Sequence, residues 1–216
     1  MATLAELIAR VALALDDADH ARWSADDLTL HLRHALELIN RASPRRMAAT
    51  VATTAGQREV SLAALGRVLT ITDVWYPWDG EETSYPPRRA PWTLLDAETL
   101  RLETAEAPLG DGADDIRLFY TAPHAIAGLD GATATTLDAY GEEIVALGAA
   151  GYASLQASLA AADAINANVA APRHFLDWAT LRLRQFRLEL DALRESAALV
   201  GDPRVALVSP GLRGEF

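Results

Sequence analysis

The sequence contains no cysteine and no lysine, and all nineteen of its basic residues are arginine. Without cysteine the chain has no disulfide, iron–sulfur cluster, thiolate zinc site or cysteine nucleophile. Without lysine it lacks the phosphate-binding lysine of P-loop enzymes and the amine of Schiff-base catalysis. The G-x-S-x-G turn around a serine nucleophile is missing as well. Because these absences remove most familiar catalytic machinery, we expect a protein that is not an enzyme and has no cofactor.

Aromatic residues are also scarce, at 6% of a chain in which 50% of the residues are hydrophobic. Much of the hydrophobic half is alanine, which favours closely packed helices over sheets filled by bulky side chains. The net charge of −11 argues against a surface that coats nucleic acid or binds anionic membranes, because it repels phosphate groups. Residues 1–20 lack the basic segment and cleavage site of a secretory signal, so we expect synthesis in the cytoplasm.

One uncharged run, residues 144–162, imitates a membrane span by its length. It consists mainly of Ala, Gly and Ser, contains a Gln, and is flanked by acidic rather than basic residues. We therefore interpret it as a buried helix and expect no membrane partner. Its small residues would let neighbouring backbones approach closely, either inside a tight bundle or at a seam between subunits.

Hydrophobic periodicity and capping signals predict an α+β fold. The capping box Thr3-Leu4-Ala5-Glu6 and the N-cap Ser24 begin two helices, and two long helices follow at about 137–165 and 172–200. The segments between them are rich in β-formers and are punctuated by Gly, Pro and Asp. We expect a mainly α-helical bundle (N-terminal helical hairpin plus two long C-terminal helices) from residues 1–46 and 123–201, an inserted antiparallel β module at 47–122, and an extended C-terminal arm at 202–216.

Within the β module, "VLTITDVWY" reads as one regular strand. Side chains alternate between the two faces of a strand. The sequence therefore predicts that Ile71 and Trp75 lie on one face and Val74 on the other.

The following segment, residues 74–92, concentrates aromatic residues and proline. Proline-rich segments stay extended, and Trp and Tyr anchor many interfaces, so we expect a projecting contact loop. The alternative is a loop folded back over the core of the β module. One functional hypothesis for this segment is a carbohydrate- or peptide-binding platform formed by Trp75, Trp78 and Trp92. The expected contact residues of the loop are Trp75, Tyr76, Trp78, Tyr85 and Trp92.

Another functional hypothesis is that the protein is a metal-dependent hydrolase. His31, His34 and Glu37 have the spacing of one helix face, although the H-E-x-x-H pattern is absent. The acidic turns "DDADH" at 16–20 and "DGADD" at 111–115 offer carboxylates, but neither completes a calcium-binding loop. We expect no metal site.

The element order resembles that of the head-to-tail adaptor, or connector, proteins of tailed bacteriophages and prophages. "ARWSADDLTLHLRHALELINR" is similar to the W-[ST]-x-x-[DE]-L opening of that family's second helix. "LLDAETLRLETAEAP" with "DDIRLFYTAPH" is similar to the β-hairpin that larger members insert, and "EEIVALGAAGYASLQAS" precedes a helix rich in Phe, Trp and Arg. Together these segments cover nearly the whole chain.

The resemblance implies a structural subunit of a virion neck, assembled in the host cytoplasm. The expected partners are further copies of the chain in a ring, typically twelve-fold in this family, a portal protein, and a tail or stopper protein. DNA would pass through the ring without specific binding. An acidic channel wall is compatible with this passage, because it repels the phosphate groups. The aromatic loop departs from the family pattern.

Two parts of the chain are candidates for portal or subunit contacts. The last long helix carries Arg182, Arg184 and Arg187, which form either a solvated face or a contact with an acidic partner. The arm is apolar between two prolines, so we expect it to be ordered only against another chain, as an added strand or in a groove of the portal. The expected contact residues of the arm are Val205, Leu207, Val208, Leu212 and Phe216.

Overall fold

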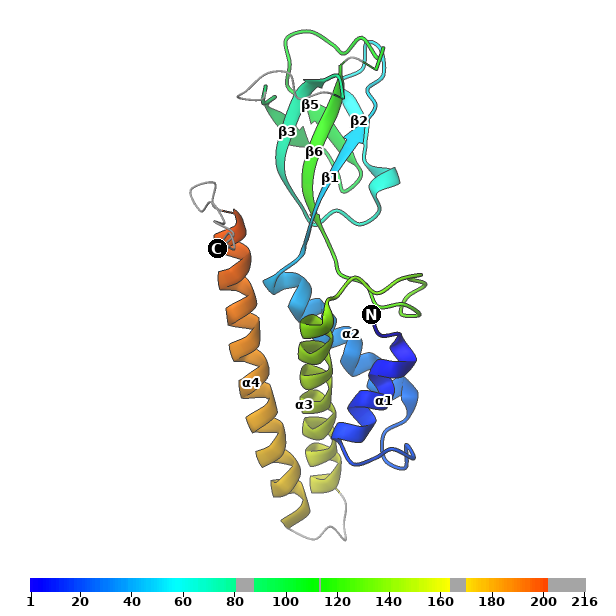
Figure 1. The fold of residues 1–216 in the computed structure, drawn as a ribbon, viewed down its shortest axis with the longest axis vertical. Coiled ribbons are helices and arrows are strands. Elements are labelled where there is room, and N and C mark those ends of the chain that lie inside the picture. The colour runs from blue at the N-terminus through cyan, green and yellow to red at the C-terminus, as the bar shows by residue number, and fades with distance from the viewer. Residues whose placement is uncertain (81–87, 113, 164–169, 202–216) are drawn as a thin grey trace, which may run out of the picture. The chain divides into compact units, whose positions relative to one another are not determined.

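The computed structural model describes residues 1–80, 88–112, 114–163 and 170–201 of the chain. Over these residues it has four α-helices and two small antiparallel sheets, which confirms the predicted α+β class (Figure 1). The chain divides into two compact units. The helical unit contains residues 1–43 and the described residues between 124 and 201, and the β unit contains residues 44–123. The expected arm, 202–216, lies outside the described residues.

Capping residues fix where the first two helices begin. Helix α1, Leu4–Ala14, starts at Thr3, whose hydroxyl accepts the Glu6 N–H while the Glu6 carboxylate accepts the Thr3 N–H. Helix α2, Ala25–Ala42, starts with the same reciprocal pair made by Ser24 and Asp27. Each box satisfies N–H groups that the first helical turn leaves without partners. Both predicted starts are confirmed.

The two long helices, α3 at Ala139–Asp163 and α4 at Ala170–Gly201, pack against each other along the unit (Figure 1). Two glycines of α3 make this close approach possible. A Cβ built on Gly148 would lie 2.8 Å from the ring of Phe186, and one on Gly151 would lie 2.9 Å from Leu183. The small residues of α3 thus serve helix packing within the chain.

Helix α3 is long and apolar enough to cross a membrane by length and composition alone. However, 61% of its most apolar window is buried inside the protein, against the neighbouring helices. The core of the helical unit runs through α3 because its alanines, Ala149 and Ala153 among them, leave room for leucines of α2 and for Phe186 of α4.

The β unit consists of two three-stranded antiparallel sheets that share one hydrophobic core. The first sheet has the order β1-β6-β3 and the second the order β2-β5-β4. Core residues come from both sheets, including Val60 and Leu100 from the second and Val74 and Leu118 from the first. The strand bounds are Arg45–Val51 (β1), Glu59–Ser61 (β2), Thr70–Trp78 (β3), Trp92–Leu94 (β4), Thr99–Leu102 (β5) and Asp115–Ala122 (β6).

The expected alternation along β3 is wrong. Ile71 pairs with Tyr120 and Val74 pairs with Leu118, so both lie on the core face. The register shifts between Ile71 and Asp73, and an extra residue in one strand of a pair moves the following side chains to the opposite face. This irregularity turns Trp75, the expected face-mate of Ile71, away from the core.

Candidate partner-binding surfaces

An aromatic group lies on the outer face of the first sheet, opposite the core. Trp75 and Trp78 project from β3 and Phe119 from β6. The centroid of the Trp75 ring lies 4.6 Å from that of the Phe119 ring, with an interplanar angle of 54°. It lies 5.9 Å from that of the Trp78 ring, with an interplanar angle of 52°. All three side chains are half-buried. We call these three residues the aromatic face.

Charged groups flank the aromatic face and hold it in place. The Trp75 indole N–H donates to the Asp73 carboxylate at 3.0 Å, and the same carboxylate pairs with Arg89 at 2.9 Å. The Arg117 guanidinium lies 5.8 Å from the centroid of the Trp78 ring. Cations over an indole face are attracted by its quadrupole. Arg117 and Phe119 were not among the expected contact residues, because their pairing with β3 depends on a register that the sequence does not reveal.

The three tryptophans of the expected loop do not share one surface. Trp92 begins β4 in the second sheet and packs against the core of the β unit. Trp75 and Trp78 are tilted by 52° rather than coplanar, and a sugar-stacking platform needs exposed ring faces. The geometry therefore gives the carbohydrate hypothesis no platform made of all three residues.

The described part of segment 74–92 also differs from the expected loop. Strand β3 continues to Trp78, since Val, Trp and Tyr are strand formers, and the register shift between Trp75 and Trp78 accommodates Pro77. The returning chain pairs with β3: the Tyr76 N–H donates to Arg88 at 2.9 Å, and the Ala90 N–H donates to Val74 at 3.1 Å. Tyr85 lies outside the described residues.

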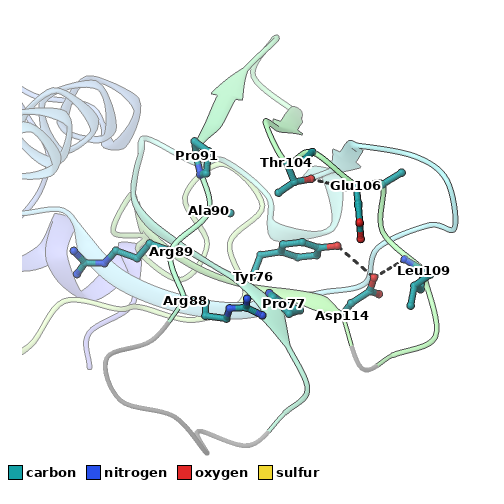
Figure 2. A pocket seen from close by; sticks show the side chains of 12 residues that line it. Tyr76, Pro77, Arg88, Arg89, Ala90, Pro91, Thr104, Glu106, Leu109 and Asp114 are labelled. Atoms are coloured by element: carbon teal, nitrogen blue, oxygen red, sulfur yellow. Dashed lines mark hydrogen bonds between the residues drawn. The ribbon is translucent and has the colours of Figure 1, made fainter.

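Tyr76 faces the other way and meets a buried carboxylate. Its hydroxyl donates to Asp114 Oδ2 at 3.3 Å, at one side of an open pocket of about 550 Å³ (Figure 2). Burial and the adjacent negative charge of Asp114 raise the pKa of Tyr76. The pocket brings Tyr76 together with Arg88, Thr104 and Glu106.

Asp114 is a structural acceptor rather than a free acid. Its carboxylate accepts the N–H groups of Leu109 and Gly110 and the hydroxyls of Thr53 and Tyr76. Burial alone would raise the pKa of Asp114, but these donors outweigh it and hold the pKa below its ordinary value. Asp114 therefore closes the loop that begins at Leu109, and each of its two oxygens already accepts two hydrogen bonds.

The other acidic turn works in the same way. Asp17 accepts the N–H groups of Ala21, Arg22 and Trp23 between α1 and α2. The Trp23 N–H is the largest cause that lowers the pKa of Asp17. This carboxylate therefore fixes the backbone of the turn that joins α1 to α2.

The two histidines of the metal hypothesis have separate partners on α3. His31 Nε2 lies 2.7 Å from Gln156 Oε1, and the ring of His34 meets that of Tyr152 edge-on at 4.5 Å. Over the described part of the chain, no group of three His, Asp or Glu residues could hold a metal ion. The expected spacing is present, but it serves packing between α2 and α3.

The arginines expected to form one surface of α4 point in different directions. The Arg182 guanidinium stacks on Trp178 at 5.0 Å, and the side chain is half-buried. Arg184 and Arg187 are exposed, and Arg184 has no ion-pair partner within the described ranges. Of these three arginines, Arg184 and Arg187 present their charged groups to solvent.

The segment "RWSADDL" connects α2 to α3. Trp23 is 4% exposed, and its indole N–H donates to the Ala153 carbonyl at 3.2 Å. Its ring also meets Phe175 of α4 edge-on at 6.3 Å. Leu28 is fully buried in the same core, while Ser24 and Asp27 form the capping box. Every fixed residue of the W-[ST]-x-x-[DE]-L pattern thus has a defined structural task at the start of α2.

No protein-family model and no curated protein matches the chain. Among solved structures, it is similar to a chain of the "Virion of native gene transfer agent (GTA) particle", with a TM-score of 0.31 and 18% identity over 82% of this chain and 91% of that chain. It is also similar to a chain of the "Neck of native GTA particle computed with C12 symmetry", with a TM-score of 0.30 and 19% identity over 78% of this chain and 89% of that chain.

Proposed function

We propose that the protein is a structural ring subunit of a phage or prophage neck, which connects the portal to the tail and continues the DNA channel. The observation that carries the proposal is the opening of α2. There the pattern that resembles the adaptor family forms a capping box and anchors a buried tryptophan on α3. Each fixed residue of the pattern therefore has a structural use in this chain: Trp23 and Leu28 are buried, and Ser24 and Asp27 cap the helix.

The charge of the chain supports passage of DNA without binding. A net charge of −11 on each copy gives a ring an acidic character, and phosphates are repelled by it. The ring is a twelve-fold homo-oligomer in this proposal, located in the virion neck. Its neighbours are the portal protein on one side and a tail or stopper protein on the other.

Two surfaces make the contacts with those neighbours. The aromatic face, with Trp75 and Trp78, is a protein contact, because clustered tryptophans beside arginine are the residues that anchor interfaces. The arm, residues 202–216, docks on the portal through its apolar side chains, and binding must repay an ordering entropy of roughly 1–2 kcal/mol per residue. Val205, Leu207, Val208, Leu212 and Phe216 occupy pockets of the partner.

Removal of the arm tests the portal contact. The full chain and a chain lacking residues 203–216 are each mixed with the portal protein of the same phage or prophage, and the complex is separated by sedimentation. We expect the full chain to sediment with the portal and the shortened chain to stay behind, with unchanged circular dichroism and melting temperature. A shortened chain that occupies the portal at full strength would remove the arm from the proposal. A full chain that never binds the portal would remove the proposed function.

A further inference from the structure

One side of α4 carries leucines that nothing in the helical unit covers. Leu181, Leu188 and Leu199 are 65%, 63% and 58% exposed. Leu188 follows Leu181 by seven residues, and Leu199 follows Leu188 by eleven. These intervals are close to two and three turns of an α-helix, so the three leucines form one stripe. The buried side of α4, with Ala179, Phe186 and Leu190, faces the opposite way.

The stripe lies at one edge of the helical unit, and α1 lies at the other. Helix α4 packs mainly on α3, whereas α1 packs on α2 and α3 (Figure 1). The outward side of α1 carries Ala5, Ala9 and Leu13 at intervals of four residues, and all three are exposed. Leu13 is 74% exposed, so this helix also presents apolar surface to solvent.

The two edges differ in the sign of their net charge, which is slightly positive for α4 and negative for the region of α1. The side chains of α4 from 173 to 199 include five arginines and four acidic residues, whereas residues 4–27 include six acidic residues and two arginines. Arg184 lies beside the leucine stripe, three residues after Leu181 and four before Leu188. The exposed carboxylates of Asp16 and Asp19 follow Leu13 at the end of α1.

We infer that the leucine stripe of α4 binds the outer face of α1 on a second copy of this chain, with Arg184 near the carboxylates beyond Leu13. This inference rests on the ring proposed above and names the surfaces that join its subunits. Two different patches at opposite edges of a subunit form a head-to-tail contact, which closes into a ring when the rotation between copies allows it. A contact of α4 with the same face of α4 on another copy would be two-fold and would stop at a dimer.

The absence of native cysteine makes this contact testable by disulfide trapping. Leu188→Cys and Ala9→Cys are introduced into the full chain, which is assembled with the portal, oxidised and run on a non-reducing gel. The matched control pairs Ala9→Cys with Arg194→Cys, since Arg194 is exposed but lies about 120° around α4 from Leu188. Melting curves of the reduced variants check that the fold is retained.

We expect a ladder of cross-linked species above the dimer for Leu188→Cys with Ala9→Cys, and at most traces for the control pair and for each single variant. Dimers from Leu188→Cys alone would show α4 facing itself and would overturn the inference. Oligomers of full size without cross-links would overturn the named interface and leave the proposed function in place. A chain that stays monomeric on its own and with the portal would overturn both.

Discussion

The seam between α3 and α4 and the surroundings of Asp114 hold their units together in opposite ways. At the seam, contact depends on atoms that are missing: Gly148 leaves the space that the Phe186 ring fills. In the β unit, contact depends on a polar group that must be present, because Asp114 accepts two backbone N–H groups and two hydroxyls. The helical unit is therefore sensitive to added volume, and the β unit to a lost acceptor.

The largest expected effect is at the seam. Gly148→Val places a branched side chain where a single Cβ already lies 2.8 Å from Phe186, so we expect destabilisation of about 3 kcal/mol. Hydrogen exchange should show lower protection in α3 and α4 and unchanged protection in β6. The matched control is Ala160→Val, an exposed position in the same helix, which should cost less than about 1 kcal/mol.

The converse change should act on the β unit alone. Asp114→Ala leaves the N–H groups of Leu109 and Gly110 without their acceptor, which costs about 2 kcal/mol. Protection of β6 and β1 should fall while α3 keeps its exchange rates. Glu98→Ala, an exposed carboxylate in the same unit, should have almost no effect. Equal loss of protection in both units would show that they unfold together, which would contradict this prediction.

A smaller effect is expected at the start of α2. Ser24→Ala removes the side chain that caps the Asp27 N–H, at a cost of about 1 kcal/mol. Ser24→Asp, which keeps an acceptor at the N-cap, should restore most of the loss. The free energy of unfolding of the helical unit, followed by circular dichroism in denaturant, measures both. Equal stabilities for Ser24→Ala and the parent chain would show that the Ser24 side chain does not stabilise the start of α2.

The smallest effect is the acid sensitivity of the β unit. The pKa of Asp114 is lower in the folded chain than in the unfolded chain, so the native state binds fewer protons. The Asp114 carboxylate stabilises the folded chain fully above about pH 4, which is near the ordinary pKa of an aspartate. This stabilisation is lost as the pH falls through the lowered pKa of the folded chain. Exchange of β6 amides below pH 4 measures this loss. Asp114→Asn should flatten the pH dependence, and an unchanged slope would assign it to other carboxylates.

The sequence predicts the helical unit better than the β unit, for a physical reason. Helix starts are local: Thr3 with Glu6 and Ser24 with Asp27 are three residues apart, and both starts are confirmed. Strand faces are not local, because one register shift near Thr72 places Ile71 and Val74 on the same side. The aromatic face could be predicted only in part, since Phe119 reaches Trp75 through strand pairing across more than forty residues.

The role of Asp114 could not be predicted from the sequence either, because its partners are distant along the chain. Its letters form an ordinary acidic turn, and only the fold brings Thr53 and Tyr76 to its oxygens. In contrast, the glycines of "GAAGYASLQAS" predicted close helix packing from composition alone, and Gly148 and Gly151 lie where α4 approaches.

In the proposed function, copies of this chain form a ring on the portal. The most direct measurement is an electron-microscopy image, with a particle mass, of the full chain assembled on the portal of the same phage or prophage. We expect a closed ring with an open central channel, and a mass that corresponds to twelve copies in addition to the portal. Single copies that remain unassociated, or irregular aggregates that leave the portal bare, would contradict it.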